Sequence, residues 1–500
     1  MKKIISLLLV LLMVVVVLVS CDNNSNESTQ GNNSQTTSNN SNDPNTSEDP
    51  LNEYQDSNGR YVSKLEVKDF QKREFRIYVR KTTGIYSSDD FTTDSEYYDE
   101  TINEAVAKRN SLVEEKYNVV LKVIKDDQIN TNIKTAINTG DDLYDAIMPT
   151  IPILTQFAQD GMLYDLTMLE NFDNKAPWWD KNATEAFSVK NRLFFTTGDI
   201  TILNKVCSPS VLFNKDIIEV EKMEDPYQLV LDKKWTFDKM YEMAKQATKE
   251  IDGETGLSGN DQWGIVAAHM DSLIFYGAAG EKLCVKNSDD LPELSYGSSQ
   301  RTIDVAQKII DRMTEVNSWV IYAQDYPEPI WETSFAAFHE GRVLFRPSGF
   351  SATTKLRAYE NLNFGILPVP LWTEDQDQYY SYCGTGEVAG IAIPLSCKDP
   401  EFAAYMIDVY ACEAKNELTP AYMEVNLKIK DAQNDKDLPM LNIIFDNITY
   451  DIGEVYNFGT IKTLFSKLVS SKSTALSSSF EAIEKTIEED IKKVIEQYDS

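Results

Sequence analysis

The segment "SFAAFHEGRVLFRPSG", Ser334–Gly349, carries a histidine, a glutamate and two arginines within sixteen residues. Such a density of functional side chains is typical of an active site, and it also occurs at the polar ends of structural elements. The apolar residues up to His339 predict a helix, Glu340-Gly341 predicts a turn, and Arg342–Arg346 predicts a strand. We therefore expect His339 and Glu340 to mark a turn, without a catalytic role.

The rest of the chain continues this alternation of strands and helices. Phe75–Arg80 alternates like a strand, Tyr98–Tyr117 has helical spacing, and Val119–Ile124 is rich in β-branched residues. Further predicted elements are a helix near Asn132–Asn138, a strand at Tyr144–Met148, a helix after Pro152, helices capped by Thr236 and Thr302, and a helix with a capping box at Ser478 and Glu481. This order indicates an α/β sheet with helices on its faces.

The N-terminal residues indicate export and anchoring. Lys2 and Lys3 precede an apolar run from Ile4 to Val19, which is typical of a secretory signal peptide over residues 1–20. The end of this run is similar to the lipobox of bacterial lipoproteins, in which the cysteine, here Cys21, carries a diacylglycerol. The alternative is an uncleaved membrane helix, for which sixteen residues are short compared with about twenty.

A polar tether follows Cys21. From Asp22 to Asp56 nearly every residue is polar, and such a stretch cannot bury enough apolar surface to offset its ordering entropy. We assign residues 21–58 to the lipidated cysteine and a disordered tether. The remaining body of about 440 residues exceeds what one hydrophobic core usually supports, so we expect two lobes.

Composition excludes several function classes. The 48 basic and 79 acidic residues give a formal charge of −31, which excludes a nucleic-acid partner because phosphate binding needs clustered basic charge. Only His269 and His339 occur, and no nucleotide-binding motif is present, so we expect no metal, no cofactor and no catalytic residue. The five cysteines after Cys21 fit no zinc pattern. We interpret them as buried apolar side chains, with a Cys383–Cys397 disulfide as the alternative.

Aromatic residues offer a different kind of site. Trp178 and Trp179 are adjacent, and neighbouring side chains of an extended chain point in opposite directions. One of the two is therefore expected to face solvent or a ligand, where a flat ring suits the apolar face of a sugar. The alternative is that either ring plugs the surface of a lobe.

Several segments, in chain order, resemble the extracellular solute-binding proteins of ABC importers, in particular the branch that includes maltose and oligosaccharide binders. They are "DDLYDAIMPTIPILTQFAQDGMLYDL" (141–166), "RLFFTTGDI" (192–200), "VLFNKDII" (211–218), "KWTFDKMYEMAKQAT" (234–248), "DQWGIVAA" (261–268), "FAAFHEGRVLFRPSG" (335–349), "NFGILPVP" (363–370) and "IAIPLSCKDPEFAAYMIDVYA" (391–411). The sequence departs from the family at Leu344-Phe345, where small residues and methionine are usual, and at Phe350-Ser351, where a sugar-stacking tryptophan often lies.

The resemblance implies a type II periplasmic-binding-protein fold of two α/β lobes joined by three chain crossings. Residues 59–200 with 364–412 would form lobe 1, and residues 205–360 with 416–500 would form lobe 2. The crossings would lie near Thr197–Val206, Asn361–Gly365 and Cys412–Leu418. The implied function is that a lipid-anchored monomer at the outer face of the cytoplasmic membrane captures a small solute, an oligosaccharide by family, and delivers it to an ABC permease.

Expected ligand contacts come from the strand ends, the crossings and aromatic residues, with core packing as the alternative for Trp331. They are Thr150, Trp178, Trp179, Asp199, Trp331, Ser348, Phe350, Tyr382 and Glu387. Two other functions stay open at this point: a membrane-anchored glycoside hydrolase, which needs two carboxyl groups about 5 to 10 Å apart, and a ligand-sensing subunit of a membrane signalling system.

Overall fold

The computed structural model describes residues 52–81, 84–315, 317–356, 359, 362–428 and 436–498. These residues fall within one unit, Pro50–Ser500. The expected signal peptide and the lipidation at Cys21 lie outside the described residues. Within the described part, no helix has both the length and the apolar character that crossing a membrane requires.

A first sheet is built from early strands. Its order is β2 (Val119–Asp126), β1 (Arg73–Arg80) and β3 (Ala146–Met148), all parallel. Residues 388–394 extend it beyond β3, because the Ile147 amide donates to Ala392 O (2.9 Å) and Ile391 exchanges backbone hydrogen bonds with Thr196. A late segment of the chain thus returns to the early sheet.

A second sheet has five strands in the order β10 (Phe364–Leu367), β4 (Pro209–Asn214), β9 (Val343–Gly349), β5 (Trp263–Ala267) and β8 (Val320–Tyr322). β4 is antiparallel to β9 and β10, whereas β5 is parallel to β8 and β9. Two short pairs complete the strands: β6 (Cys284–Lys286) with β7 (Pro292–Leu294), and β11 (Ser381–Tyr382) with β12 (Ile448–Thr449).

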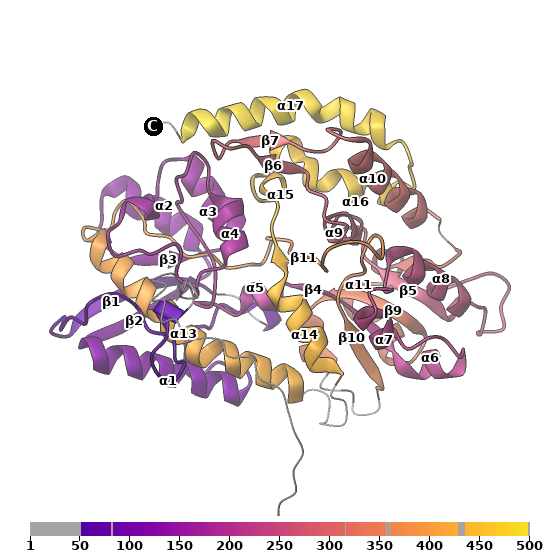
Figure 1. Ribbon diagram of the computed structural model, residues 1–500, viewed down its shortest axis with the longest axis horizontal. Helices are drawn as coiled ribbons and strands as arrows, with labels where there is room; N and C mark the ends of the chain where they lie inside the picture. Colours follow the sequence, from indigo (N-terminus) through magenta and orange to yellow (C-terminus); the bar gives the residue numbers. More distant parts are fainter. Residues whose placement is uncertain are drawn as a thin grey trace, which may run out of the picture. The chain divides into compact units, whose positions relative to one another are not determined.

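Helices cover both sheets (Figure 1). Those before β4 are α1 (Glu100–Tyr117), α2 (Ile129–Thr139), α3 (Ile151–Gln159), α4 (Lys181–Phe187) and α5 (Leu203–Val206). Those that follow are α6 (Lys215–Val220), α7 (Pro226–Leu231), α8 (Phe237–Ala247), α9 (Asp271–Ala278), α10 (Gln300–Met313), α11 (Ile330–His339) and α12 (Ser351–Leu356). The C-terminal helices are α13 (Pro400–Lys428), α14 (Asp437–Asp446), α15 (Ile452–Tyr456), α16 (Leu464–Ser470) and α17 (Leu476–Gln497). Short 3₁₀ turns are η1 (Asn52–Tyr54), η2 (Gly84–Tyr86), η3 (Leu166–Met168), η4 (Ala323–Asp325) and η5 (Phe458–Thr463).

The segment Ser334–Gly349 folds as predicted. α11 ends at His339, Gly341 adopts the left-handed region at φ +81°, and β9 follows. Glycine suits this position because it has no Cβ to clash at positive φ. Most predicted strands and helices also exist, but two helix starts were wrong: Ser299, not Thr302, caps α10, and α17 begins at Leu476, before the predicted cap.

The chain crosses between the two sheets at three places, and one of them, the return crossing, differs from expectation. The first crossing lies between residue 196 and β4, as expected. The return crossing follows β10, because β10 pairs with β4 in the second sheet; the predicted boundary at residue 364 was wrong. The third crossing runs through α13 without a break in the helix.

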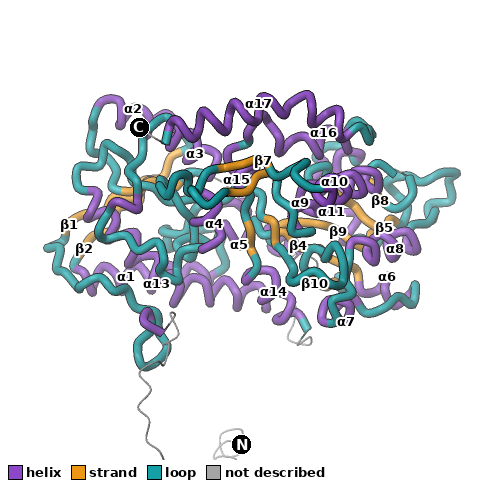
Figure 2. Tube along the Cα trace, turned by 45° about the horizontal axis from the view of Figure 1, so that its top comes forward, coloured by secondary structure: helices purple, strands orange, loops and turns teal. Residues whose placement is uncertain are grey.

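α13 connects the two halves physically. Its first half packs along α1 (Figures 1 and 2). Near its other end, Tyr422 packs against Phe445 of α14, and the Asn426 side chain contacts the Thr353 hydroxyl in α12. Because α14 and α12 flank the second sheet, one continuous helix spans both lobes.

Candidate functional site

The carboxyl ends of the parallel strands in both sheets are the natural place to look for a ligand site, because ligands of open α/β sheets lie there. In the first sheet β1 ends at Arg80, and Thr150 follows β3. In the second sheet β5 ends at Ala267 and β9 at Gly349.

These two edges meet at η2, which follows β1. The Tyr86 hydroxyl lies 3.1 Å from the Ser351 hydroxyl at the start of α12. Arg80 Nη2 donates to the Tyr86 carbonyl (3.3 Å), and Arg80 Nη1 pairs with Glu387 (2.8 Å). Burial raises the pKa of Tyr86, so its hydroxyl keeps the proton and can donate across the junction. We call Arg80, Tyr86, Ser351 and Glu387 the junction cluster.

Cys207 lies beside this cluster, at the end of α5. Burial raises the pKa of its thiol and the nearby Glu387 adds to the shift, so the thiol stays protonated. All five described cysteines are free, and four of them are buried. The interpretation as buried apolar side chains is confirmed for those four, and the alternative Cys383–Cys397 disulfide is absent from the described residues.

Asp199 has a different environment from the one predicted. It is buried at the first crossing, where its carboxylate accepts from Lys205 Nζ (2.9 Å), Lys415 Nζ (3.0 Å) and the Thr419 hydroxyl (2.6 Å). Burial alone would raise the pKa of Asp199, but the two lysines and the threonine outweigh it and lower the pKa to about 2. Because Lys415 and Thr419 belong to α13, Asp199 ties the first crossing to the third.

The two tryptophans are also interior. Trp178 is 1% exposed and Trp179 is 5% exposed, so the expectation that one of them faces solvent is wrong. Trp178 Nε1 donates to Asp408 (3.0 Å), and its ring packs edge-on against Tyr54. Rings this deeply buried offer no open face to a sugar in this structure.

Three further predicted contacts are buried. Thr150 precedes α3 and pairs through its backbone with Ala389. Phe350 packs against Phe445, with ring centroids 4.7 Å apart. Tyr382 packs against Gly277, where an added Cβ would fall 1.9 Å from the Tyr382 ring. The structure therefore places these three side chains in the protein interior.

Trp331, Ser348 and Glu387 remain accessible. Trp331, in the first turn of α11, is 43% exposed, and Ser348 is half-buried near the end of β9. Sequence reasoning missed Arg80 and Tyr86, although Arg80 ends a predicted strand. The position of Arg80 at the end of a predicted strand could have identified it from the sequence, because strand ends face the ligand site in this fold class.

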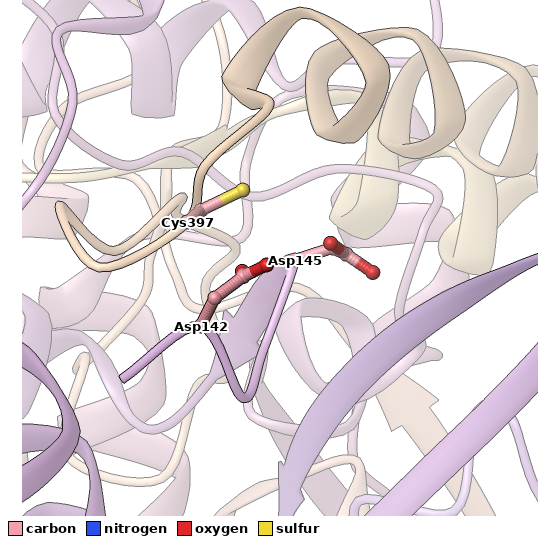
Figure 3. A group of neighbouring side chains, drawn as sticks. All are labelled: Asp142, Asp145 and Cys397. Carbon is pink, nitrogen blue, oxygen red and sulfur yellow. The ribbon is translucent and has the colours of Figure 1, made fainter. Parts of the chain in front are cut away.

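Asp142, Asp145 and Cys397 form a group that could attract a metal ion (Figure 3). Arg76 already pairs with both carboxylates: Arg76 Nη2 lies 2.6 Å from Asp145 Oδ1 and 2.9 Å from Asp142 Oδ1. Burial raises the pKa of Cys397 to about 12, so the thiol is protonated beside this ion pair. The group is therefore explained as an arginine site that joins β1 to the loop before β3.

Two sheets joined by three crossings, with their carboxyl edges meeting at a polar junction, define the class of two-lobed solute-binding proteins. The family model of bacterial extracellular solute-binding proteins matches residues 111–419. The chain belongs to this family, and the resemblance noted from the sequence is confirmed. Comparison with curated proteins finds no match.

Solved structures share the fold. They include a cyclo/maltodextrin-binding protein complexed with maltotetraose (TM-score 0.55, 13% identity, 85% of this chain and 98% of the other). The GacH receptor of Streptomyces glaucescens, studied with acarbose, has a TM-score of 0.52 at 13% identity, covering 83% and 99%. An ABC substrate-binding protein from Listeria monocytogenes in complex with cycloalternan has a TM-score of 0.50 at 16% identity, also covering 83% and 99%. These likenesses confirm the two-lobed α/β fold.

Proposed function

We propose that this extracellular solute-binding protein captures an oligosaccharide between its two lobes and delivers it to an ABC import permease. The observation that carries the proposal is the junction where the carboxyl edges of both sheets meet through Tyr86 and Ser351. The three similar structures were solved in complex with cycloalternan, acarbose and maltotetraose, and they support a sugar as the ligand class.

The proposed mechanism is a shift in a hinge equilibrium. A ligand that touches both lobes stabilises the closed arrangement relative to the open one, and its differential affinity sets the extent of the shift. The Tyr86–Ser351 hydrogen bond joins the two lobes directly, so it contributes only when they are closed. We propose that a permease then recognises the closed form and that Cys21, through its lipid, keeps the protein at the membrane.

We further propose binding without turnover. The exposed carboxylate of the junction cluster, Glu387, is held in an ion pair with Arg80. Asp199, the acid at the first crossing, is buried between two lysines. Glycoside hydrolysis needs one carboxyl group that keeps a proton and another across the sugar. Neither of these two carboxylates meets that description.

A ligand panel tests the function. Protein lacking residues 1–50 should be stabilised in thermal unfolding by at least one of maltotetraose, mannotriose, acarbose and cycloalternan, because a ligand that binds only the folded state raises its stability. The sugar should be recovered unchanged by chromatography. Cleaved product would contradict the binder and favour the hydrolase.

Trp331→Ala should weaken binding of the stabilising sugar by about 1 kcal/mol, or about fivefold, because the exposed indole offers a stacking surface. The melting temperature without sugar should change little, since an exposed side chain contributes little to folding. Isothermal titration calorimetry measures the affinity, with Trp331→Phe as a control that keeps a ring. Equal affinity of Trp331→Ala and wild type would remove Trp331 from the site.

Tyr86→Phe should also weaken sugar binding, by about 1 kcal/mol, since it deletes one hydrogen bond of the closed arrangement. Tyr380→Phe is the matched control, because the Tyr380 hydroxyl bonds only locally with Asp377 (3.0 Å). Calorimetry with the same sugar gives both affinities. An unchanged affinity of Tyr86→Phe would show that this contact is not part of closure.

A further inference from the structure

A hairpin of the second lobe contacts a tight turn of the first lobe. β6 and β7 lie between α9 and α10, which connect β5 to β8 in the second sheet. The turn between β6 and β7, residues 287–291, contacts the turn 188–192, which follows α4. The turn 188–192 belongs to the first lobe, because the Leu193 carbonyl just beyond it accepts from the Leu166 amide (2.7 Å).

Asp290 and Lys286 carry this contact. The Asp290 carboxylate accepts from the Asn191 amide (2.8 Å) and from the Ser188 hydroxyl (3.2 Å). The Asp290 carbonyl accepts from the Lys190 amide (3.0 Å). Lys286 Nζ donates to the Ser188 hydroxyl (2.7 Å) and carbonyl (3.1 Å), and it also pairs with Asp290. The side chains of Lys286 and Asp290 are only 16% and 17% exposed, so salt and water screen this pair less than a surface pair.

Both turns hold residues other than glycine in the left-handed region of the backbone. The φ angle is +57° at Lys190, +60° at Asn191 and +59° at Asp290. This conformation is unfavourable for residues with a Cβ, least so for Asn and Asp. The two successive amides that the first turn presents both donate to Asp290. The contact therefore compensates a backbone geometry that both turns adopt at a conformational cost.

The C-terminal helices make a second contact between the lobes. α15 packs on β6 and also contacts α3 and α4 of the first lobe, while α17 packs on β7. The Tyr456 hydroxyl donates to the Phe187 carbonyl (3.1 Å), and Arg192 Nη1 donates to the Tyr498 carbonyl (2.8 Å). Tyr498 is 2% exposed and packs edge-on against Phe194, with ring centroids 4.9 Å apart.

These contacts differ in kind from the crossings. A crossing is continuous chain and stays intact when the lobes move, whereas hydrogen bonds between the lobes break when the lobes separate. The contacts also lie away from the third crossing, since α17 and α13 run along opposite sides of the two sheets (Figures 1 and 2). They therefore stabilise the closed arrangement and contribute nothing to an open one.

We propose that Lys286, Asp290, Tyr456 and Tyr498 form a latch that holds the two lobes together before a solute binds. The proposal deepens the proposed function and rests on its hinge equilibrium. With the latch intact, the closed arrangement is the major state and the solute enters through a minor open state. The closed fraction sets the apparent affinity, and the open fraction sets the rate of entry. Release of the latch should therefore make binding weaker and faster at once.

X-ray scattering of protein lacking residues 1–50, in the absence of sugar, tests the latch. The variants are Asp290→Gly, Tyr456→Phe and the double variant; glycine keeps the left-handed backbone at position 290 and removes the carboxylate. The double variant should have a larger radius of gyration than wild type. Asp289→Gly, which removes the same charge from an exposed position of the same turn, is the matched control and should scatter like wild type.

Stopped-flow fluorescence tests the kinetic consequence with whichever of maltotetraose, acarbose and cycloalternan binds wild type. The double variant should associate about fivefold faster or more and bind about fivefold more weakly or more, because the open fraction rises while the closed fraction falls. Its radius of gyration should return to the wild-type value when the sugar is added. A substitution that only damages the protein would weaken binding without accelerating association.

Each contrary result has a distinct meaning. A double variant with the radius of gyration of sugar-free wild type, or one that associates no faster, would overturn the latch and leave solute capture intact. If none of the three sugars binds wild type but the double variant is still the larger, the latch stands and the sugar ligand of the proposed function is wrong. Circular dichroism checks folding, and if the double variant does not fold, Asp290→Gly alone decides.

Discussion

Trp178→Ala is expected to lower the free energy of unfolding by about 3 to 5 kcal/mol, the range for removing a large buried aromatic side chain. Trp178 is 1% exposed, donates to Asp408 and packs edge-on against Tyr54 at 5.6 Å. The substitution removes the packing and also a donor to a buried carboxyl group. Urea unfolding followed by circular dichroism measures the change.

The control for this prediction is Trp331→Ala, which removes the same side chain from an exposed position. It should change the free energy of unfolding by about 0.5 kcal/mol or less. A Trp178→Ala protein that keeps its stability but loses sugar affinity would restore the stacking role expected from the sequence. The two substitutions therefore separate a tryptophan of the core from an exposed one.

Asp199→Ala should destabilise the protein by a similar amount, about 3 to 5 kcal/mol, because it leaves Lys205 and Lys415 without their shared partner in the interior. Those lysines come from different crossings, so the hinge itself should loosen. Urea unfolding gives the stability. Glu185→Ala, which removes an exposed ion pair with Lys181, is the control and should change stability by about 0.5 kcal/mol or less.

The dependence of stability on acidic pH is a second test of the role of Asp199. Its folded pKa of about 2 lies below the ordinary value of 3.8, so the unfolded state binds the proton first as the pH falls. The stabilisation from this group is complete above about pH 4 and is lost as the pH falls toward 2. Asp199→Asn should show a weaker loss of stability over that window than wild type. An identical acid dependence would mean that other carboxylates govern it.

Local patterns predicted elements where neighbouring residues determine the conformation. The helix, turn and strand of Ser334–Gly349 follow from apolar spacing and from a glycine at positive φ, and both signals lie within a few residues. The start of α10 was misplaced by three residues, because Ser299 and Thr302 are both good capping residues and only the backbone path selects between them.

Site residues were predicted less well, and Trp178-Trp179 shows why. The prediction assumed an extended chain, in which adjacent side chains diverge. The chain turns here instead, since the Trp179 amide donates to the Ala176 carbonyl (3.1 Å). Tyr54 and Asp408, which enclose Trp178, are far away in sequence. No local pattern contains that information.

The sequence by itself determined the α/β class, the two-lobed family and the position of most strands and helices, because these depend on periodicity and on the order of segments along the chain. Only the tertiary structure decided that Asp199 joins two crossings and that β10 belongs to the second sheet. Each of these depends on contacts between residues distant in the chain. Burial and charge at such contacts are set by packing, which a one-dimensional pattern does not record.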